Sequence, residues 1–228
     1  MKKTEQKTKL ETRKHKAFRR TLVCLAVLVV FSVLHLYMFT PMQGIYYAET
    51  QNGTGRTHVV TRMLPPGELH LWGTLFYLTA NENAVLMSDV QFHPLMGWFD
   101  TMGASLDCSE EAAIHAGRWS VGHEEVYVQY AFGRVDDPEI QSVAVSVEEV
   151  RYRTGEEVRE ELFRTEIEDA RWFQKGDNRY FVIPVKDPRE TNDDLERVTY
   201  SVVGLDTEGR EIARSIDEWG AYTEVHMG

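Results

Sequence analysis

The sequence predicts a mainly β protein with one N-terminal transmembrane helix, and three observations support that prediction. A charge-free apolar run follows a basic N-terminus, short segments of alternating polar and apolar residues fill the rest, and turn-forming residues separate them. This spacing is typical of a β-sandwich, of which the immunoglobulin-like architecture is one candidate form. The predicted parts are a basic cytoplasmic tail (1–20), a transmembrane anchor (21–39), a flexible stalk (40–56) and an extracytoplasmic β-rich domain (57–228).

Charge is divided unequally along the 228 residues. Residues 1–20 contain nine Lys or Arg and two Glu, a net charge of +7, whereas the whole chain carries −11 and the remainder therefore −18. A domain with this negative charge repels nucleic acid and anionic lipid headgroups. We therefore expect no nucleic-acid partner for the part of the chain that follows the apolar run.

The apolar run Leu22–Phe39 reads LVCLAVLVVFSVLHLYMF. As a helix, these residues would extend about 27 Å, close to the thickness of the hydrocarbon core of a bilayer. Arg19 and Arg20 precede the run, so the positive-inside rule predicts a cytoplasmic N-terminus. A cleaved signal peptide is the alternative, but its best site would place the large Tyr46 where signal peptidase requires a small residue. We expect a retained single-pass anchor in the cell membrane, with the β-rich domain on the outer side.

Strands are predicted from segments in which β-branched and aromatic residues alternate with polar ones. The predicted strands are 58–64, 68–79, 84–92, 125–135, 140–153, 156–169, 179–185, 197–206 and 210–216. Val143, Val145 and Val147, for example, would share one face of a strand. Residues 156–169 would also suit a helix by their charges, but the neighbouring strands favour a strand.

Residues 93–122 are predicted to be irregular, with one short helix over 110–117. Ser109 would cap that helix at its N-terminus, and Gly117 would end it. Four residues of metal-ligand types lie in this stretch or directly after it, namely His93, Cys108, His115 and His123. Imidazole and thiolate groups together bind transition metals, so a metal site is one hypothesis, although the spacing matches no known metal-binding frame.

Motifs for phosphate binding, serine hydrolysis and zinc peptidase chemistry are absent from the sequence, so we predict no cofactor. Trp98 and Trp119 fall in the irregular stretch and are the predicted ligand surface, because exposed aromatic rings bind peptides and sugars. The first functional hypothesis is a non-enzymatic binding module of the cell envelope, with an envelope protein or the cell wall as partner. The alternatives are a metal-binding envelope protein that uses His93–His123 and a structural subunit of a membrane complex.

Overall fold

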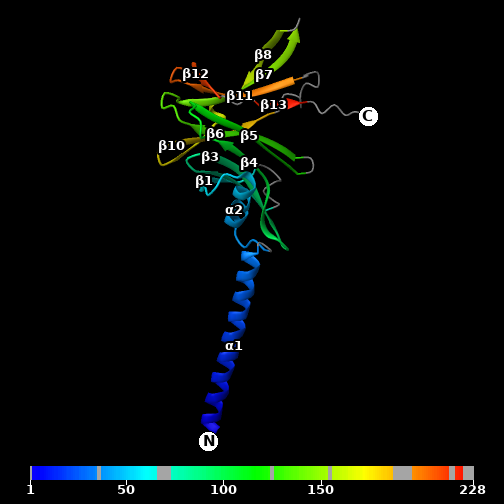
Figure 1. Ribbon diagram of the computed structural model, residues 1–228, viewed down its shortest axis with the longest axis vertical. Helices are drawn as coiled ribbons and strands as arrows, with labels where there is room; N and C mark the ends of the chain where they lie inside the picture. Colours follow the sequence, from blue (N-terminus) through cyan, green and yellow to red (C-terminus); the bar gives the residue numbers. More distant parts are fainter. Residues whose placement is uncertain are drawn as a thin grey trace, which may run out of the picture.

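The computed structural model describes residues 2–34, 37–65, 73–123, 126–153, 156–186, 197–215 and 219–222. The described chain is mainly β, with three antiparallel sheets above two α-helices (Figure 1). The β-rich nature of the protein, predicted from the alternation of polar and apolar residues, is confirmed.

Three sheets contain the strands of the described residues. Sheet A consists of β1 (His58–Met63), β2 (Thr74–Ala80), β3 (Ala84–His93) and β4 (Gly97–Asp107), in that order. Sheet B has the order β5 (Ile114–His123), β6 (Val126–Val135), β10 (Asn178–Val185) and β9 (Arg171–Lys175). Sheet C has the order β12 (Glu211–Arg214), β11 (Arg197–Leu205), β7 (Ser142–Arg153) and β8 (Glu156–Arg164), and β13 (Trp219–Tyr222) also pairs with β11.

Sheet B lies between the other two sheets and is apolar on both faces. In β10, Tyr180 and Val182 pack in the core shared with sheet A, whereas Phe181 and Ile183 pack in the core shared with sheet C. Successive side chains of a strand point to opposite faces, so a strand in the middle layer must be apolar at nearly every position. The stacking of sheets expected of a sandwich is therefore present, but an immunoglobulin-like arrangement of two sheets does not account for the third layer.

Helix α2 (Pro41–Asn52) occupies most of residues 40–56, the expected flexible stalk. Ile45 is fully buried and packs with Tyr77 and Val90 on the outer face of sheet A. Gly53 ends the helix with φ 67°. This segment is a packed helix in the structure, because its apolar side chains find an apolar sheet face that the linear sequence does not reveal.

Helix α1 (Lys2–Val33) contains the N-terminal tail and the first part of the apolar run. It ends at Val33, so the single transmembrane helix expected over 21–39 is not confirmed; His35 and Leu36 lie outside the described residues. In the described parts of the chain, no helix is both long enough and apolar enough to cross a bilayer.

The stretch 93–122 is more regular than predicted. It contributes most of β4 and β5, and the short helix expected over 110–117 is wrong because Ile114 begins β5. Two glycines of this stretch fit the packing of the strands: Gly103 leaves room for the Asn52 side chain of α2, and Gly117 lies under the ring of Phe132. Long-range strand pairing overrides the local signals here.

Candidate functional site

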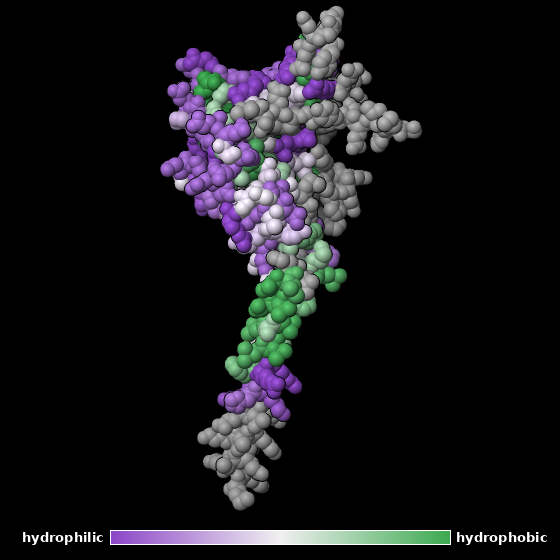
Figure 2. Space-filling view, viewed as in Figure 1, coloured by the Kyte–Doolittle hydropathy of each residue, from purple (hydrophilic) through white to green (hydrophobic). Residues whose placement is uncertain are grey.

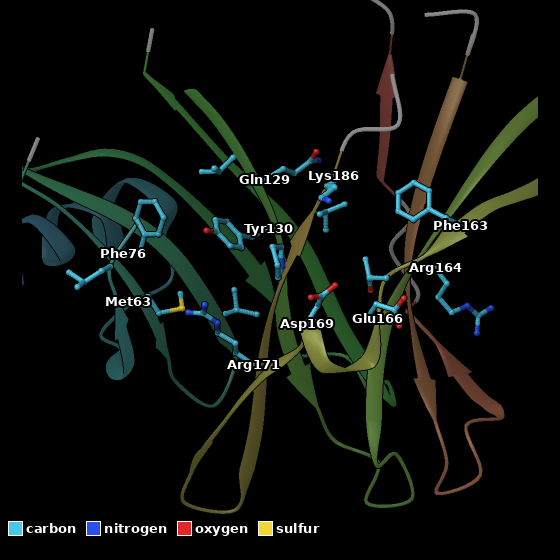
Figure 3. Close-up of a pocket in the computed structure, with 16 residues that line it drawn as sticks. Met63, Phe76, Gln129, Tyr130, Phe163, Arg164, Glu166, Asp169, Arg171 and Lys186 are labelled. Atoms are coloured by element: carbon cyan, nitrogen blue, oxygen red, sulfur yellow. The ribbon is translucent and has the colours of Figure 1, made fainter. Parts of the chain in front are cut away.

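A cavity of about 600 Å³ opens at one edge of sheet B, and we call it the edge slot (Figure 3). Its volume lies within the range of ordinary ligand pockets. It is lined by Met63, Leu64, Phe76, Val128, Gln129, Tyr130, Phe163, Arg164, Thr165, Glu166, Asp169, Arg171, Val182, Pro184, Val185 and Lys186. These residues come from all three sheets, so the slot exists only in the assembled fold.

The slot exists because β9 is shorter than its neighbour β10. The last pair between them joins Arg171 and Val182, and the chain reaches β9 from β8 through a 3-10 helix, η2 (Ile167–Asp169). Beyond Val182, β10 still pairs with β6 on one side but has no β9 residue on the other. Among the described residues, no strand pairs with this side of β10 beyond Val182.

Pro184 lies in the uncovered part of β10. Residues of a strand direct their backbone groups alternately to the two sides. Gly176 and Asp177 form the two-residue turn between β9 and β10, so the flanking residues Lys175 and Asn178 are a hydrogen-bonded pair. The backbone groups of Asn178 therefore point toward β9. Pro184 lies an even number of residues further along β10, so its backbone groups point to the same side, where the slot is. Proline has no N–H, so at this position it limits the pairing of another strand with the open edge.

Aromatic residues form the wall of the slot on the side of sheet A. The Phe76 ring meets Tyr130 at 6.0 Å between centroids and Trp119 at 4.8 Å, both edge to face. Trp119 stacks behind Tyr130 at 6.0 Å. Figure 3 shows Phe76, Met63 and Tyr130 on one side of the slot and Phe163 and Arg164 on the other. The interlocked rings make this wall apolar and firm.

The wall on the side of sheet C is fixed by hydrogen bonds. The hydroxyl of Thr165 accepts the N–H of Val145 at 2.8 Å. The guanidinium of Arg164 is bound by the carboxylates of Glu161 at 2.8 Å and Glu211 at 3.2 Å. These contacts hold the end of β8 in place, so this wall is preformed.

Gln129 is the buried polar side chain of the slot. It is 5% exposed, and its Nε2 has no hydrogen-bond partner among the described residues. A buried amide without a partner costs free energy, roughly 1–3 kcal/mol. Gln129 therefore offers an N–H donor that a ligand in the slot would satisfy.

Charged groups of both signs surround the mouth of the slot. Arg171 and Lys186 are positive, Glu166 and Asp169 are negative, and all four side chains are exposed. Burial raises the pKa of Tyr130, while the positive charge of Arg171 acts in the opposite direction. The Tyr130 hydroxyl is therefore protonated at neutral pH. The slot combines an apolar wall with hydrogen-bond donors and a mixed-charge rim, an arrangement suited to binding an amphipathic ligand.

The four predicted metal ligands do not come together. His93 lies at the β3–β4 turn, where its Nδ1 accepts the N–H of Leu95 at 3.2 Å, and Cys108 lies at the opposite end of sheet A. His115 and His123 belong to the same strand, β5, and eight residues of strand span about 26 Å. The side chain of His123 lies outside the described residues. Among the described residues, no three His, Cys, Asp or Glu side chains form a metal-binding group.

Cys108 and His115 lie near the same end of the core between sheets A and B. Arg134 of β6, which pairs with His115, donates to the carbonyl of Cys108 at 3.1 Å. The imidazole of His115 is 3.3 Å from the carboxylate of Asp136. Burial raises the pKa of the Cys108 thiol from 9.0 to about 11, so the sulfur is protonated at neutral pH and is a poor nucleophile or metal ligand.

The two tryptophans of the predicted ligand surface differ in their surroundings. Trp119 is 2% exposed, so its ring belongs to the core and the prediction of an exposed platform is wrong for it. Trp98 is half-buried on sheet A, 5.5 Å from the ring of Phe92 and packed against the α2 side of the sheet. Trp119 still supports the site, because it backs the slot residues Phe76 and Tyr130.

Sequence reasoning missed the slot because its lining comes from five distant segments. Pro184 was the one available signal, since a proline in an otherwise apolar strand marks an edge. Comparison with known proteins finds no matching family model, no similar curated protein and no similar solved structure.

Proposed function

We propose that this chain is a membrane-anchored, non-enzymatic binding module, and that the edge slot takes a segment of a partner protein in the cell envelope. The slot supports this proposal, because it is preformed, apolar on one wall and furnished with a buried donor at Gln129 that has no partner among the described residues. Pro184 limits strand addition, so recognition would rest on side chains of the partner entering the slot rather than on a continuous backbone ladder.

Anchoring in the membrane is supported by the surface of α1. Every large apolar side chain from Leu22 to Leu34 is at least 45% exposed, so the helix is apolar around its circumference. Figure 2 shows this apolar band between a polar end and the β-rich domain. An exposed apolar surface of this extent requires a partner, and a lipid bilayer provides one. The basic residues before the band support a cytoplasmic N-terminus, by the positive-inside rule.

Site-directed photo-crosslinking in living cells tests the binding role. A photoreactive amino acid replaces Leu64 at the slot rim, or Glu208 in the distant β11–β12 turn as the matched exposed control. We expect one reproducible protein adduct from position 64 and none from position 208. The adduct should weaken with Arg171→Glu but not with Lys175→Glu at the other end of β9. Equal adducts from both positions, or none from position 64, would contradict the slot as the binding site.

Extraction of membranes at alkaline pH tests the anchor separately. An integral protein stays in the membrane pellet, whereas a peripheral protein is released. Release of the full-length chain into the supernatant would contradict the anchoring part of the proposal and leave the slot experiment unaffected.

A further inference from the structure

The turn between β3 and β4 presents an uncharged apolar surface to solvent. Phe92, Leu95 and Met96 are exposed, Leu95 by 80%, and no Asp, Glu, Lys or Arg occurs between positions 90 and 99. We call these three residues the hairpin tip. Exposed Leu, Met and Phe side chains gathered on one turn mark a surface that contacts a partner or a membrane.

The hairpin tip is attached to the chain that leaves the apolar helix. Met38 donates its N–H to the carbonyl of Met96 at 2.9 Å, and its carbonyl accepts the N–H of Trp98 at 2.7 Å. Gly97 makes this bridge sterically feasible, because a Cβ there would lie 2.0 Å from the Met38 carbonyl oxygen. In Figure 1 the β3–β4 hairpin extends beside α2 toward the end of α1.

The link between α1 and α2 is also held by hydrogen bonds. The side-chain oxygen of Gln43 accepts the N–H groups of Phe39 at 2.7 Å and Thr40 at 3.1 Å. The side-chain nitrogen of Gln43 donates to the hydroxyl of Ser32 in α1. Together with the Met38 bridge, these bonds fix the hairpin tip relative to the apolar helix.

We propose that the hairpin tip inserts into the outer interface of the bilayer beside the anchor, so that the β-rich domain rests on the membrane. This inference relies on the proposed membrane anchoring and adds a second lipid contact to it. Phe39, Tyr46 and Tyr47 are exposed near the same end of the domain, and aromatic side chains favour this interface. In Figure 2 the apolar band of α1 continues into an apolar patch on the adjoining end of the domain.

The length of α1 supports the same arrangement. Its apolar part, Leu22–Val33, contains 12 residues and spans about 18 Å, whereas the hydrocarbon core is about 30 Å thick. An apolar helix that is shorter than the hydrocarbon core thins the bilayer locally, which brings the flanking parts of the chain closer to the membrane. The hairpin tip supplies apolar surface at the place where the helix ends.

Backbone chemistry agrees with this placement. Non-helical backbone near membrane depth needs partners for its N–H and C=O groups, since lipid provides none. The N–H and C=O of Met38 and the N–H groups of Phe39 and Thr40 all have such partners within the chain. The described backbone from Met38 to Thr40, which follows the end of α1, is therefore compatible with a position near the membrane where water is scarce.

Fluorescence quenching of the full-length chain tests the inference. The protein is reconstituted into vesicles of phosphatidylcholine with a minority of phosphatidylglycerol, some lipids carrying a nitroxide at the headgroup or on the acyl chain. An environment-sensitive fluorophore is attached to Leu95→Cys or, as control, to Glu208→Cys, each in a Cys24→Ser background. Cys108 is buried and stays unlabelled. A third sample carries the fluorophore on the native Cys24.

We expect lipid nitroxides to quench position 95 several-fold more than position 208. Quenching at Cys24 without quenching at position 95 would overturn the inference and leave the anchor in place. Absence of quenching at Cys24 would overturn the anchoring proposal and this inference with it. A charged variant, Leu95→Lys with Met96→Lys, should reduce lipid quenching of a fluorophore at Tyr47→Cys, whereas Ile212→Lys on distant β12 should not. Equal quenching in both variants would also contradict insertion of the tip.

Discussion

The guanidinium of Arg134 holds the carboxylate of Asp136 through two hydrogen bonds, Nε to Oδ1 at 2.7 Å and Nη2 to Oδ2 at 2.8 Å. The same guanidinium also reaches sheet A, where Nη1 donates to the carbonyl of Glu82 at 2.8 Å and Nη2 to that of Cys108 at 3.1 Å. Arg134 is buried, so its charge depends on these partners. One side chain of sheet B therefore ties two layers together.

Replacing Asp136 by Asn should destabilise the protein. The substitution leaves the buried Arg134 without its carboxylate, and loss of one partner of a buried pair costs roughly 3–5 kcal/mol. Asp136 is 34% exposed, so water compensates in part and we expect about 2 kcal/mol. Urea unfolding of the full-length chain in detergent micelles measures the difference. Glu139→Gln, an exposed neighbour, is the control, and equal stability of the two variants would contradict the role assigned to Asp136.

Stability should fall at alkaline pH because of Cys108. Its pKa is about 11 in the folded protein and 9.0 in its ordinary state, so the folded form favours the neutral thiol. The contribution of the neutral thiol to the free energy of unfolding is fully present below pH 9.0. It is lost as the pH rises from 9.0 toward 11, because the thiol of the unfolded chain ionises at a lower pH than that of the folded protein. Thermal unfolding across this pH range should show a shallower decline in Cys108→Ala. A Cys24→Ser variant should follow the unmodified chain; identical slopes in all three proteins would disprove the effect.

Alanine at Gly97 should cost more than alanine at Gly209. Both glycines have φ 78°, so the two substitutions share the backbone penalty, about 1–2 kcal/mol. Only at Gly97 does the new methyl group collide with the Met38 carbonyl, while Gly209 has open space around it. Hydrogen exchange of the Met38 and Trp98 amides should accelerate several-fold in Gly97→Ala and stay unchanged in Gly209→Ala. Similar exchange in both variants would show that the bridge tolerates a side chain.

Leucine at Gln129 should stabilise the free protein and weaken partner binding. The substitution removes a buried N–H donor that has no partner among the described residues, and it keeps the side-chain size. We expect it to raise the free energy of unfolding by about 1 kcal/mol. Unfolding in urea measures this gain, and the photo-crosslink from position 64 should fall in yield. Gln51→Leu on the exposed surface of α2 should change neither. A destabilised Gln129→Leu protein would indicate that the amide already has a partner.

Prediction from the sequence succeeded where the pattern is local and failed where distant residues decide. The segments behind β1, β2, β3, β6, β7, β8, β10, β11 and β12 were recognised because β-branched and aromatic residues gather there between turn-forming residues. The strand β5 was mistaken for a helix in part, since Ser109 and Gly117 resemble helix ends. Its pairing with β6 from Ile114 to His123 supplies backbone hydrogen bonds that no local signal predicts.

The sequence by itself determined the separation of charge, the apolar run and the mainly β character of the chain, because composition and short-range periodicity are enough for these. Only the tertiary structure decided that sheet B lies between two others, that Trp119 is core, and that Pro184 borders a slot. It also decided that the apolar helix ends at Val33 and that Met38 pairs with Gly97. These features depend on contacts between residues far apart in the chain, and such contacts form only when the layers assemble.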